Sequence, residues 1–293
     1  MQAELVVDAR HGTGESPVWH VGEQALYGVD IPARTPWRLD VASGQLSNWL
    51  APEMLGCIAW GGRPGRWIAG MESGIFELQT QGAELQSKRL AAVAHAAPDM
   101  RFNDGRCDRQ GRLWAGTMVM NMGLASKAGA LYRYDGAGLQ RVIGDLITPN
   151  GLGFSPDGRV MYLSDSHPSV QSIWAFDYDA ESGTPSNRRL FVDMNAYPGR
   201  PDGAAVDAEG CYWICGNDAG LIHRFTPAGQ LDCSLAVPVK KPAMCAFGGA
   251  GLDTLFVTSI RPGGDVDLSD QPLAGSVFAL RPGVRGLPEP AFV

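Results

Sequence analysis

Short apolar runs recur along the chain at a nearly constant interval. Six runs of four residues stand out, and their first residues are separated by 41, 46, 48, 51 and 43 residues. Most of them combine aromatic or β-branched residues, which are typical of strands. The runs are residues 26–29, 67–70, 113–116, 161–164, 212–215 and 255–258.

A second apolar run follows several of these after a polar gap, at residues 75–78, 131–134, 173–176 and 277–280. Apolar and polar residues alternate in Tyr132-Arg133-Tyr134, the pattern of a strand with one buried face. A period of about 45 residues with about four strands per unit is the signature of a propeller blade. We therefore predict an all-β fold, a six-bladed β-propeller, as a single domain over residues 1–293.

The first strand-like segment, residues 4–8, precedes the first repeat. We expect this N-terminal strand to complete the last blade, because pairing the two ends of the chain leaves no sheet edge open. A two-sheet sandwich is the weaker alternative, since it does not explain a fixed period. Helical periodicity is modest and confined to residues 90–97.

The composition adds limits on partners and location. The 38 Gly and 20 Pro are spread evenly, so they punctuate strands rather than mark a linker. The net charge is −7 and no basic run exists, which argues against nucleic acid and anionic membranes as partners. No segment is typical of a secretory signal or a membrane span. The six cysteines form no Cys-x-x-Cys pair, so we expect reduced thiols in a cytoplasmic protein.

Four polar residues share one phase of the repeat, each just before the expected innermost strand of a blade. They are Glu15, Asn103, Asn150 and Asp202. Equivalent positions of a radial repeat point to a common axis, so these side chains form an oxygen-lined hole that suits a hard divalent cation. We expect Glu15, Asn150 and Asp202 to be the metal ligands, with open positions left for water.

The plain alternative is that these residues only make turns. Asn-Gly and Asp-Gly pairs are good turn formers, and Asn150-Gly151 and Asp202-Gly203 fit that description. Recurrence at one phase favours the axial site, and Glu15 is not a turn-forming residue. Calcium, zinc, manganese, magnesium and ferrous iron are all compatible with such an oxygen set plus water.

Short motifs spread over essentially the whole chain add a resemblance. They are Gly14-Glu-Ser-Pro-Val-Trp19, Arg101-Phe-Asn-Asp-Gly-Arg-Cys-Asp108, Gly111-Arg-Leu-Trp-Ala-Gly-Thr-Met118, Asn150-Gly-Leu152 and Pro201-Asp-Gly203. In order and spacing they resemble the SMP-30/gluconolactonase/LRE family, also called the regucalcin family. The resemblance implies a six-bladed propeller with one axial divalent metal ion and hydrolysis of sugar lactones.

The resemblance also implies roles for single residues. Glu15, Asn150 and Asp202 would bind the metal ion, and Arg101 and Asn103 would contact the substrate. Some family members carry an acidic residue in the loop after Gly-Thr-Met, and Asn121 is the nearest polar match here. The expected partner is a small sugar lactone, and the expected assembly is a monomer or a weak homo-oligomer.

The mechanistic hypothesis assigns a role to each group. The metal ion acts as a Lewis acid on the lactone carbonyl, and Arg101 and Asn103 stabilise the oxyanion. Asp202 is the general base that activates water, with a metal-bound water as the alternative source of the nucleophile. The product is an open aldonic acid.

Other functions stay open at this point. A calcium-binding regulatory protein, a propeller that binds protein partners, and a hydrolase of other esters or phosphotriesters all fit the same scaffold. Asp165-Ser166-His167 contains the residue types of a catalytic triad, but strand neighbours point to opposite faces. Asp165 and Asp30 share a strand-end phase, as braces of the site or as solvated strand ends. His167 is a candidate substrate contact from a loop above the channel.

Overall fold

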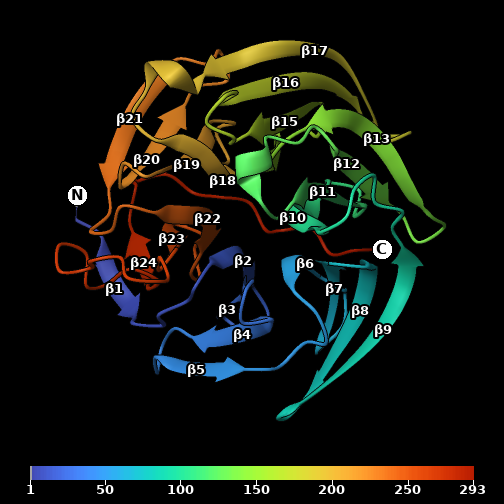
Figure 1. Ribbon diagram of the computed structural model, residues 1–293. Helices are drawn as coiled ribbons and strands as arrows, with labels where there is room; N and C mark the ends of the chain where they lie inside the picture. Colours follow the sequence, from blue (N-terminus) through green and yellow to red (C-terminus); the bar gives the residue numbers. More distant parts are fainter. Residues whose placement is uncertain (1) are drawn as a thin grey trace.

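Six four-stranded antiparallel sheets surround a central axis in the computed structural model, which describes residues 2–293 (Figure 1). The fold is the predicted six-bladed β-propeller. Blades one to three are β2 (Gly14–His20), β3 (Ala25–Asp30), β4 (Thr35–Asp40), β5 (Gln45–Asn48); β6 (Leu55–Trp60), β7 (Arg66–Met71), β8 (Gly74–Gln81), β9 (Glu84–Ala92); and β10 (Met100–Cys107), β11 (Leu113–Val119), β12 (Gly129–Tyr134), β13 (Leu139–Leu146).

Blades four to six continue the ring in chain order. They are β14 (Pro149–Phe154), β15 (Val160–Asp165), β16 (Ser172–Asp179), β17 (Thr184–Asp193); β18 (Arg200–Val206), β19 (Tyr212–Asn217), β20 (Leu221–Phe225), β21 (Leu231–Ala236); and β22 (Pro242–Gly248), β23 (Thr254–Ser259), β24 (Val277–Leu280) with β1 (Glu4–Val7). Two single-turn 3₁₀ helices, η1 (Met122–Leu124) and η2 (Met194–Ala196), lie in loops. No helix among residues 2–293 is long and apolar enough to cross a bilayer.

The sixth blade contains strands from both ends of the chain. β1 pairs antiparallel with β24, with Glu4 opposite Ala279 and Leu5 opposite Phe278. This pairing joins the N-terminal segment to the last repeat, so the ring is held closed by backbone hydrogen bonds. Residues 90–97, the modest helix candidate, are not helical. β9 extends to Ala92 and pairs with β8, because the ladder with β8 continues to Gly74 opposite Ala92.

Apolar side chains fill the six interfaces between neighbouring blades. Each interface has its own buried cluster that combines residues of two blades; between blades one and two, for example, Tyr27 packs with Trp67. The six first strands β2, β6, β10, β14, β18 and β22 pack against one another around the axis (Figure 1). The blades are thus wedges with apolar sides, which leaves the axial end of each first strand free to carry polar groups.

A backbone irregularity recurs in every innermost strand. The pairing register with the second strand shifts at Glu15/Val18, Leu55/Cys57, Phe102/Gly105, Asn150/Gly153, Pro201/Ala204 and Pro242/Cys245. Ser16 and Gly151 adopt positive φ values of 49° and 58° at two of these bulges. Bulges re-aim side chains and occur often beside active sites. The four predicted polar residues lie at or within these bulges, inside the first strands rather than just before them.

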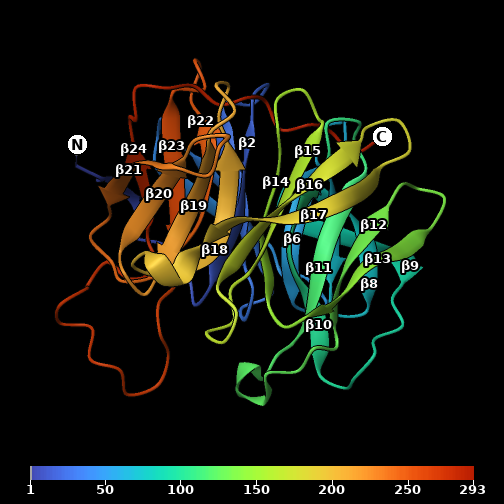
Figure 2. The same cartoon turned by 90° about the horizontal axis from the view of Figure 1, so that it is seen from above.

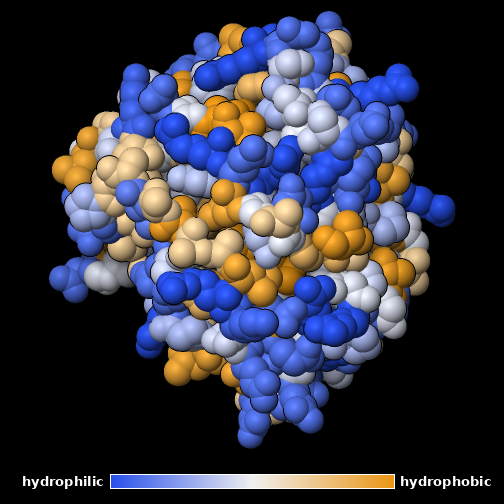
Figure 3. Space-filling model, turned by 90° about the vertical axis from the view of Figure 1, so that its right-hand side faces the viewer, coloured by the Kyte–Doolittle hydropathy of each residue, from blue (hydrophilic) through white to orange (hydrophobic). Residues whose placement is uncertain are grey.

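The two faces of the disc carry different segments. The η1 loop and the loop of residues 260–276 project from one face, and the C-terminus lies at the other (Figure 2). The last residues run across that second face: Phe292 N–H donates to Trp60 O at 2.7 Å, and the Phe292 ring stacks on Tyr134. From the side of blades two and three, apolar residues form a band between hydrophilic regions (Figure 3). The tail covers the interface of these two blades, where Phe292 belongs to the buried cluster.

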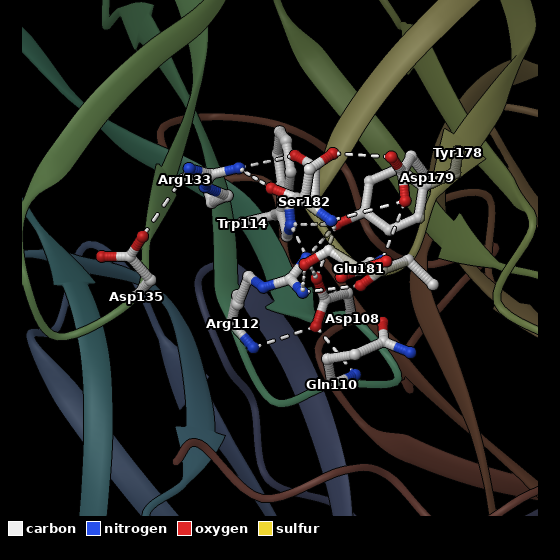
Figure 4. Close-up of polar contacts among 12 residues, drawn as sticks. Asp108, Gln110, Arg112, Trp114, Arg133, Asp135, Tyr178, Asp179, Glu181 and Ser182 are labelled. Atoms are coloured by element: carbon white, nitrogen blue, oxygen red, sulfur yellow. Dashed lines mark hydrogen bonds and ion pairs between the residues drawn. The ribbon is translucent and has the colours of Figure 1, made fainter.

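A polar network ties blade three to blade four on the face of the C-terminus (Figure 4). The fully buried Asp108 accepts hydrogen bonds from Gln110 N, Arg112 N and Tyr178 Oη at 2.9, 2.9 and 2.5 Å. Arg112 pairs with Asp108 at 3.2 Å and donates to the carbonyl oxygen of Ala180 at 2.6 Å. The Asp108 carboxylate therefore accepts two backbone N–H groups of its own turn and, through Tyr178, holds blade four to blade three.

Replacement of that carboxylate tests the network. We expect Asp108→Ala to lower the free energy of unfolding by about 3–5 kcal/mol, because it leaves a partly buried Arg112 guanidinium without its charge partner. Urea unfolding measures the change. The control is Asp177→Ala, whose exposed ion pair with Arg189 should leave the unfolding midpoint near that of the parent. Equal midpoints for Asp108→Ala and the parent would contradict the assigned role.

Candidate active site

Two carboxylates are buried at the axial end of the first strands. Glu15 lies on β2 and Asp202 on β18, with exposed fractions of 8% and 7%. Glu15 Oε2 has no hydrogen-bond partner among the described residues. Burial, and then the charges of Asp202 and Asp104, raise the pKa of Glu15 well above its usual range. Burial also raises the pKa of Asp202 to about 7, against the opposing hydrogen bond from Asn217.

A hydrogen-bonded chain joins three of the other predicted residues. Arg101 Nη1 donates to Asn103 Oδ1 at 2.8 Å. Asn103 Nδ2 donates to Pro149 O at 3.1 Å and to Asn150 Oδ1 at 3.2 Å. Asn150 Nδ2 in turn donates to Ser166 Oγ at 2.9 Å, so the amide oxygen of Asn150 faces Asn103 rather than Ser166. The chain fixes the orientation of both amides.

Arg101 links this chain electrostatically to the carboxylates. Burial lowers the pKa of Arg101 to about 10, and the charges of Glu15, Glu72 and Asp202 act in the opposite direction. The strands that carry Arg101 and Glu15, β10 and β2, also contact one another around the axis. The structure thus brings Glu15, Arg101 and Asp202 to one end of the axis, and hydrogen bonds add Asn103 and Asn150.

Two further aspartates hold the loops that enter the first strands. Asp30 accepts from Gly12 N and Thr13 N at 3.0 and 2.9 Å. Asp165 accepts from Ile147 N and Thr148 N at 2.7 and 3.0 Å. Both carboxylates are buried, so they are braces of the site rather than solvated strand ends. Each lies 15 residues after a predicted metal ligand, Glu15 and Asn150 respectively.

Asn121 lies in the η1 loop, and His167 contacts the same loop. Asn121 is exposed, and its side chain accepts a hydrogen bond from Gly123 N at 3.1 Å as the N-cap of η1. His167 Nε2 lies 3.2 Å from Met122 O, and Nδ1 lies 2.7 Å from Ser169 Oγ. The carbonyl can only accept, so Nε2 carries the proton in this arrangement. The substrate contacts of both residues stay predictions.

Three further residues at this end of the axis were not predicted from the sequence: Asp104, Ser166 as the partner of Asn150, and Asn217. Asp104 is buried beneath the site; its Oδ2 accepts from Leu152 N at 2.9 Å, and its Oδ1 has no partner among the described residues. Asn217 donates from Nδ2 to Asp202 Oδ2 at 2.5 Å. A signal for Asn217 existed, because it lies 15 residues after Asp202, as Asp30 does after Glu15.

The donor set fits a divalent cation. Glu15 offers a buried carboxylate oxygen without a hydrogen-bond partner among residues 2–293, and burial and then the charge of Asp202 raise the pKa of Glu15. Asn150 adds a neutral amide oxygen whose orientation is fixed by Ser166. Buried charges without partners are costly, and hard cations prefer such oxygen ligands. A cation bound here would remove the repulsion between the two carboxylates.

A second acidic cluster lies on the other face of the disc, and its carboxylates already have a charged partner. Asp207, Glu209 and Cys211 offer ligand atoms within 4.8 Å of one another. Arg224 already fills the cluster, with Nε 2.9 Å from Asp207 Oδ2 and Nη2 2.6 Å from Glu209 Oε2. The guanidinium balances these charges, so the axial site is the better cation site.

Known proteins share this fold and sequence over almost their full length. The family model of the SMP-30/gluconolactonase/LRE-like region matches residues 13–261. A 6-deoxy-6-sulfogluconolactonase from Pseudomonas putida is 41% identical over 95% of this chain and 94% of its own. Regucalcin from Danio rerio is 33% identical over 98% of this chain and 97% of its own.

A solved structure agrees with these sequence relatives. The calcium-binding protein regucalcin from Agrobacterium tumefaciens superposes with a TM-score of 0.92 at 28% identity, over 99% of this chain and 97% of that one. The family match covers more than half of the chain, and it includes all the predicted site residues. The chain therefore belongs to the SMP-30/gluconolactonase/LRE family.

Proposed function

We propose that this protein is a lactonase that hydrolyses a sugar lactone to the open aldonic acid with the help of one divalent cation. The observation that carries the proposal is the buried Glu15 carboxylate, whose Oε2 has no hydrogen-bond partner among the described residues, near Asp202 and Arg101. The Pseudomonas relative, named as a sulfogluconolactonase, supports the substrate class. Glu15, Asn150 and Asp202 would hold the cation, which when bound polarises the lactone carbonyl.

Arg101 is suited to bind the carbonyl end of the substrate, and Asn103 is suited to hold the guanidinium in place. The guanidinium offers several N–H donors, of which Nη1 is engaged with Phe102 O and Asn103 Oδ1. Charge-assisted donors become stronger as negative charge develops on the carbonyl oxygen. Asn103 holds Arg101 in place through its amide oxygen and is itself fixed by Pro149 O. Arg101 would therefore stabilise the oxyanion more than the neutral lactone, and Asn103, whose two N–H donors are engaged, would position Arg101.

Asp202 is the proposed general base. Asn217 occupies Oδ2, which leaves Oδ1 to accept the proton of the attacking water. The oxygen of this water bonds to the carbonyl carbon, and the ester bond to the ring oxygen breaks. The proton held by Asp202 then passes to the leaving alkoxide, so the residue is regenerated.

The substrate class is tested with a panel of aldonolactones of both ring sizes, including 6-deoxy-6-sulfogluconolactone. We expect acid release from at least one lactone, measured with a pH indicator, and its loss on addition of a chelator. We expect Asp202→Asn to lower kcat by about 10²–10⁴-fold, the contribution of a general base. Cation binding without hydrolysis of any lactone would instead favour a calcium-binding role, and activity confined to phosphotriesters would favour that alternative.

Arg101 has a separate expected effect. Arg101→Ala should lower kcat/KM by roughly 10–10²-fold, because hydrogen bonds to a charged group contribute about 1.5–3 kcal/mol. Arg101→Lys keeps the charge but loses the planar fork, so it should recover only part of the loss. Steady-state kinetics on the best lactone measures both. An unchanged kcat/KM in Arg101→Ala would remove this residue from the substrate site.

If Glu15 is a cation ligand, Glu15→Gln should change the stability of the protein differently without and with a bound cation. In the protein stripped with a chelator, Glu15→Gln should be at least as stable as the parent, because it removes a buried acidic group. A saturating divalent cation should stabilise the parent by about 3 kcal/mol at a hundredfold excess over Kd, and Glu15→Gln by much less. Thermal unfolding with and without cation measures this gain, with Asp177→Asn as the matched surface control. A full gain in Glu15→Gln would contradict the ligand assignment.

Cation binding should also depend on pH. The pKa values of Glu15 and Asp202 are raised in the absence of a cation, so both carboxyl groups hold protons at pH values where free carboxyls are ionised. Binding must displace these protons, and affinity should rise with pH by up to about tenfold per pH unit for each proton released. Calorimetry at about pH 6 and about pH 8 in buffers of different ionisation heat counts the protons. Equal affinities without proton release would contradict the prediction.

A further inference from the structure

We propose that Asn217 is a positioning residue for Asp202 and that Arg200 holds Asn217 in its working orientation. The inference rests on the proposed function, since it concerns how the cation ligand and base is held. Asn217 is the last residue of β19, with an exposed fraction of 2%. Its Nδ2 lies 2.5 Å from Asp202 Oδ2, a bond between two buried groups of the same blade.

Arg200 faces the other end of the same amide. Arg200 and Asn217 are directly opposite one another in the β18–β19 pair. The guanidinium Nη2 lies 3.5 Å from Asn217 Oδ1, and Nη1 donates to Ser166 O at 3.2 Å. Asn217 therefore presents its oxygen to a cation and its N–H to an anion. A flipped amide would face like partners at both ends, so the charges on the two sides select one orientation.

Arg200 is itself fixed. Its Nε lies 2.6 Å from Asp218 Oδ2, and Asp218 also pairs with Lys241 from the loop before β22. The side chain of Arg200 is largely buried. A chain of alternating charge thus runs from Lys241 through Asp218 and Arg200 to the amide of Asn217 and ends at Asp202. Such outer partners orient ligands and commonly change metal affinity or activity by 10–100-fold.

Residue 217 is an asparagine, whereas the equivalent residues of blades one and four are aspartates. The positioning role of Asn217 explains this difference. The positions 15 residues after the other two ligands are Asp30 and Asp165, whose carboxylates accept backbone N–H groups. An aspartate at 217 would face the Asp202 carboxylate at hydrogen-bond distance, and like charges in such a place repel strongly. An asparagine of the same shape replaces that repulsion with a donor. Asp202 then has one oxygen fixed and one free for the cation and water.

The test compares isosteric variants by cation affinity as well as activity. Ca²⁺ and Zn²⁺ are titrated into chelator-stripped protein, and the tighter ion is used for all variants. Asn217→Leu keeps the approximate volume without the donor; we expect its cation Kd to rise by about 10–100-fold and kcat at saturating cation to fall, with little change in KM. Arg200→Lys, which keeps the pair with Asp218, should show a smaller change in the same direction. Asn48→Leu on the exposed end of β5 is the matched control and should behave as the parent.

The outcomes separate this inference from the proposed function. If the parent hydrolyses a lactone and Asn217→Leu keeps parental Kd and kcat, the positioning role is overturned and the lactonase stands. If no lactone is hydrolysed but Asn217→Leu weakens cation binding, the positioning role stands and the lactonase fails. If Asn217→Leu does not fold, Arg200→Lys decides: parental Kd and kcat in that variant overturn the chain of contacts. Failure of the parent to bind either ion overturns both.

Discussion

The need to balance two buried carboxylates organises one end of this molecule. Glu15 and Asp202 come from blades one and five, and burial raises the pKa of each. Such groups either hold a proton or need a partner that stabilises their charge, because an uncompensated buried charge is costly. Arg101 supplies part of the compensating positive charge, and a divalent cation would supply the rest. Asn217 orients the Asp202 carboxylate and Asn103 orients Arg101, and as neutral amides they add nothing to the repulsion between the carboxylates.

In the propeller, the residues that stabilise the ring lie apart from the residues of the candidate site. Apolar clusters at the six blade interfaces, and networks such as that of Asp108 on the second face, hold the ring together away from the site. The first strands are then free to carry a bulge at one phase in every blade. Because each bulge turns residues toward the axis, side chains that lie far apart in the sequence meet at one point. The strain of the bulges is local, since the ladders resume within two or three residues.

The sequence predicted most of the fold because the propeller repeats the same physical solution six times. The runs beginning at Leu26 and Leu255 are both second strands, and the spacing between such runs set the blade number. Residues 90–97 were wrongly given helical character, since an exposed outer strand such as β9 tolerates helix-forming residues and is held by its ladder with β8. The common phase of Glu15, Asn150 and Asp202 was visible in the sequence, and so was the 15-residue spacing that leads from Asp202 to Asn217. Asp104 depends on which way the bulged strand β10 turns its side chain, and no linear pattern specifies that direction.

The charged side chains differ between the two ends of the axis. Below Glu15 and Asp202 lies Asp104, and below that the largely buried Arg106 donates to Ala204 O at 2.8 Å, which links blade three to blade five. Arg106 lies 3.6 Å from Glu289 of the C-terminal segment, so the tail and an arginine together occupy the far end of the axis. The positive charge of Arg106 opposes the rise in the pKa of Asp104, whereas Asp104 adds to the negative potential felt by Glu15. The end of the axis that carries Glu15 and Asp202 therefore keeps three acidic side chains near the single charge of Arg101, a distribution that would favour a cation.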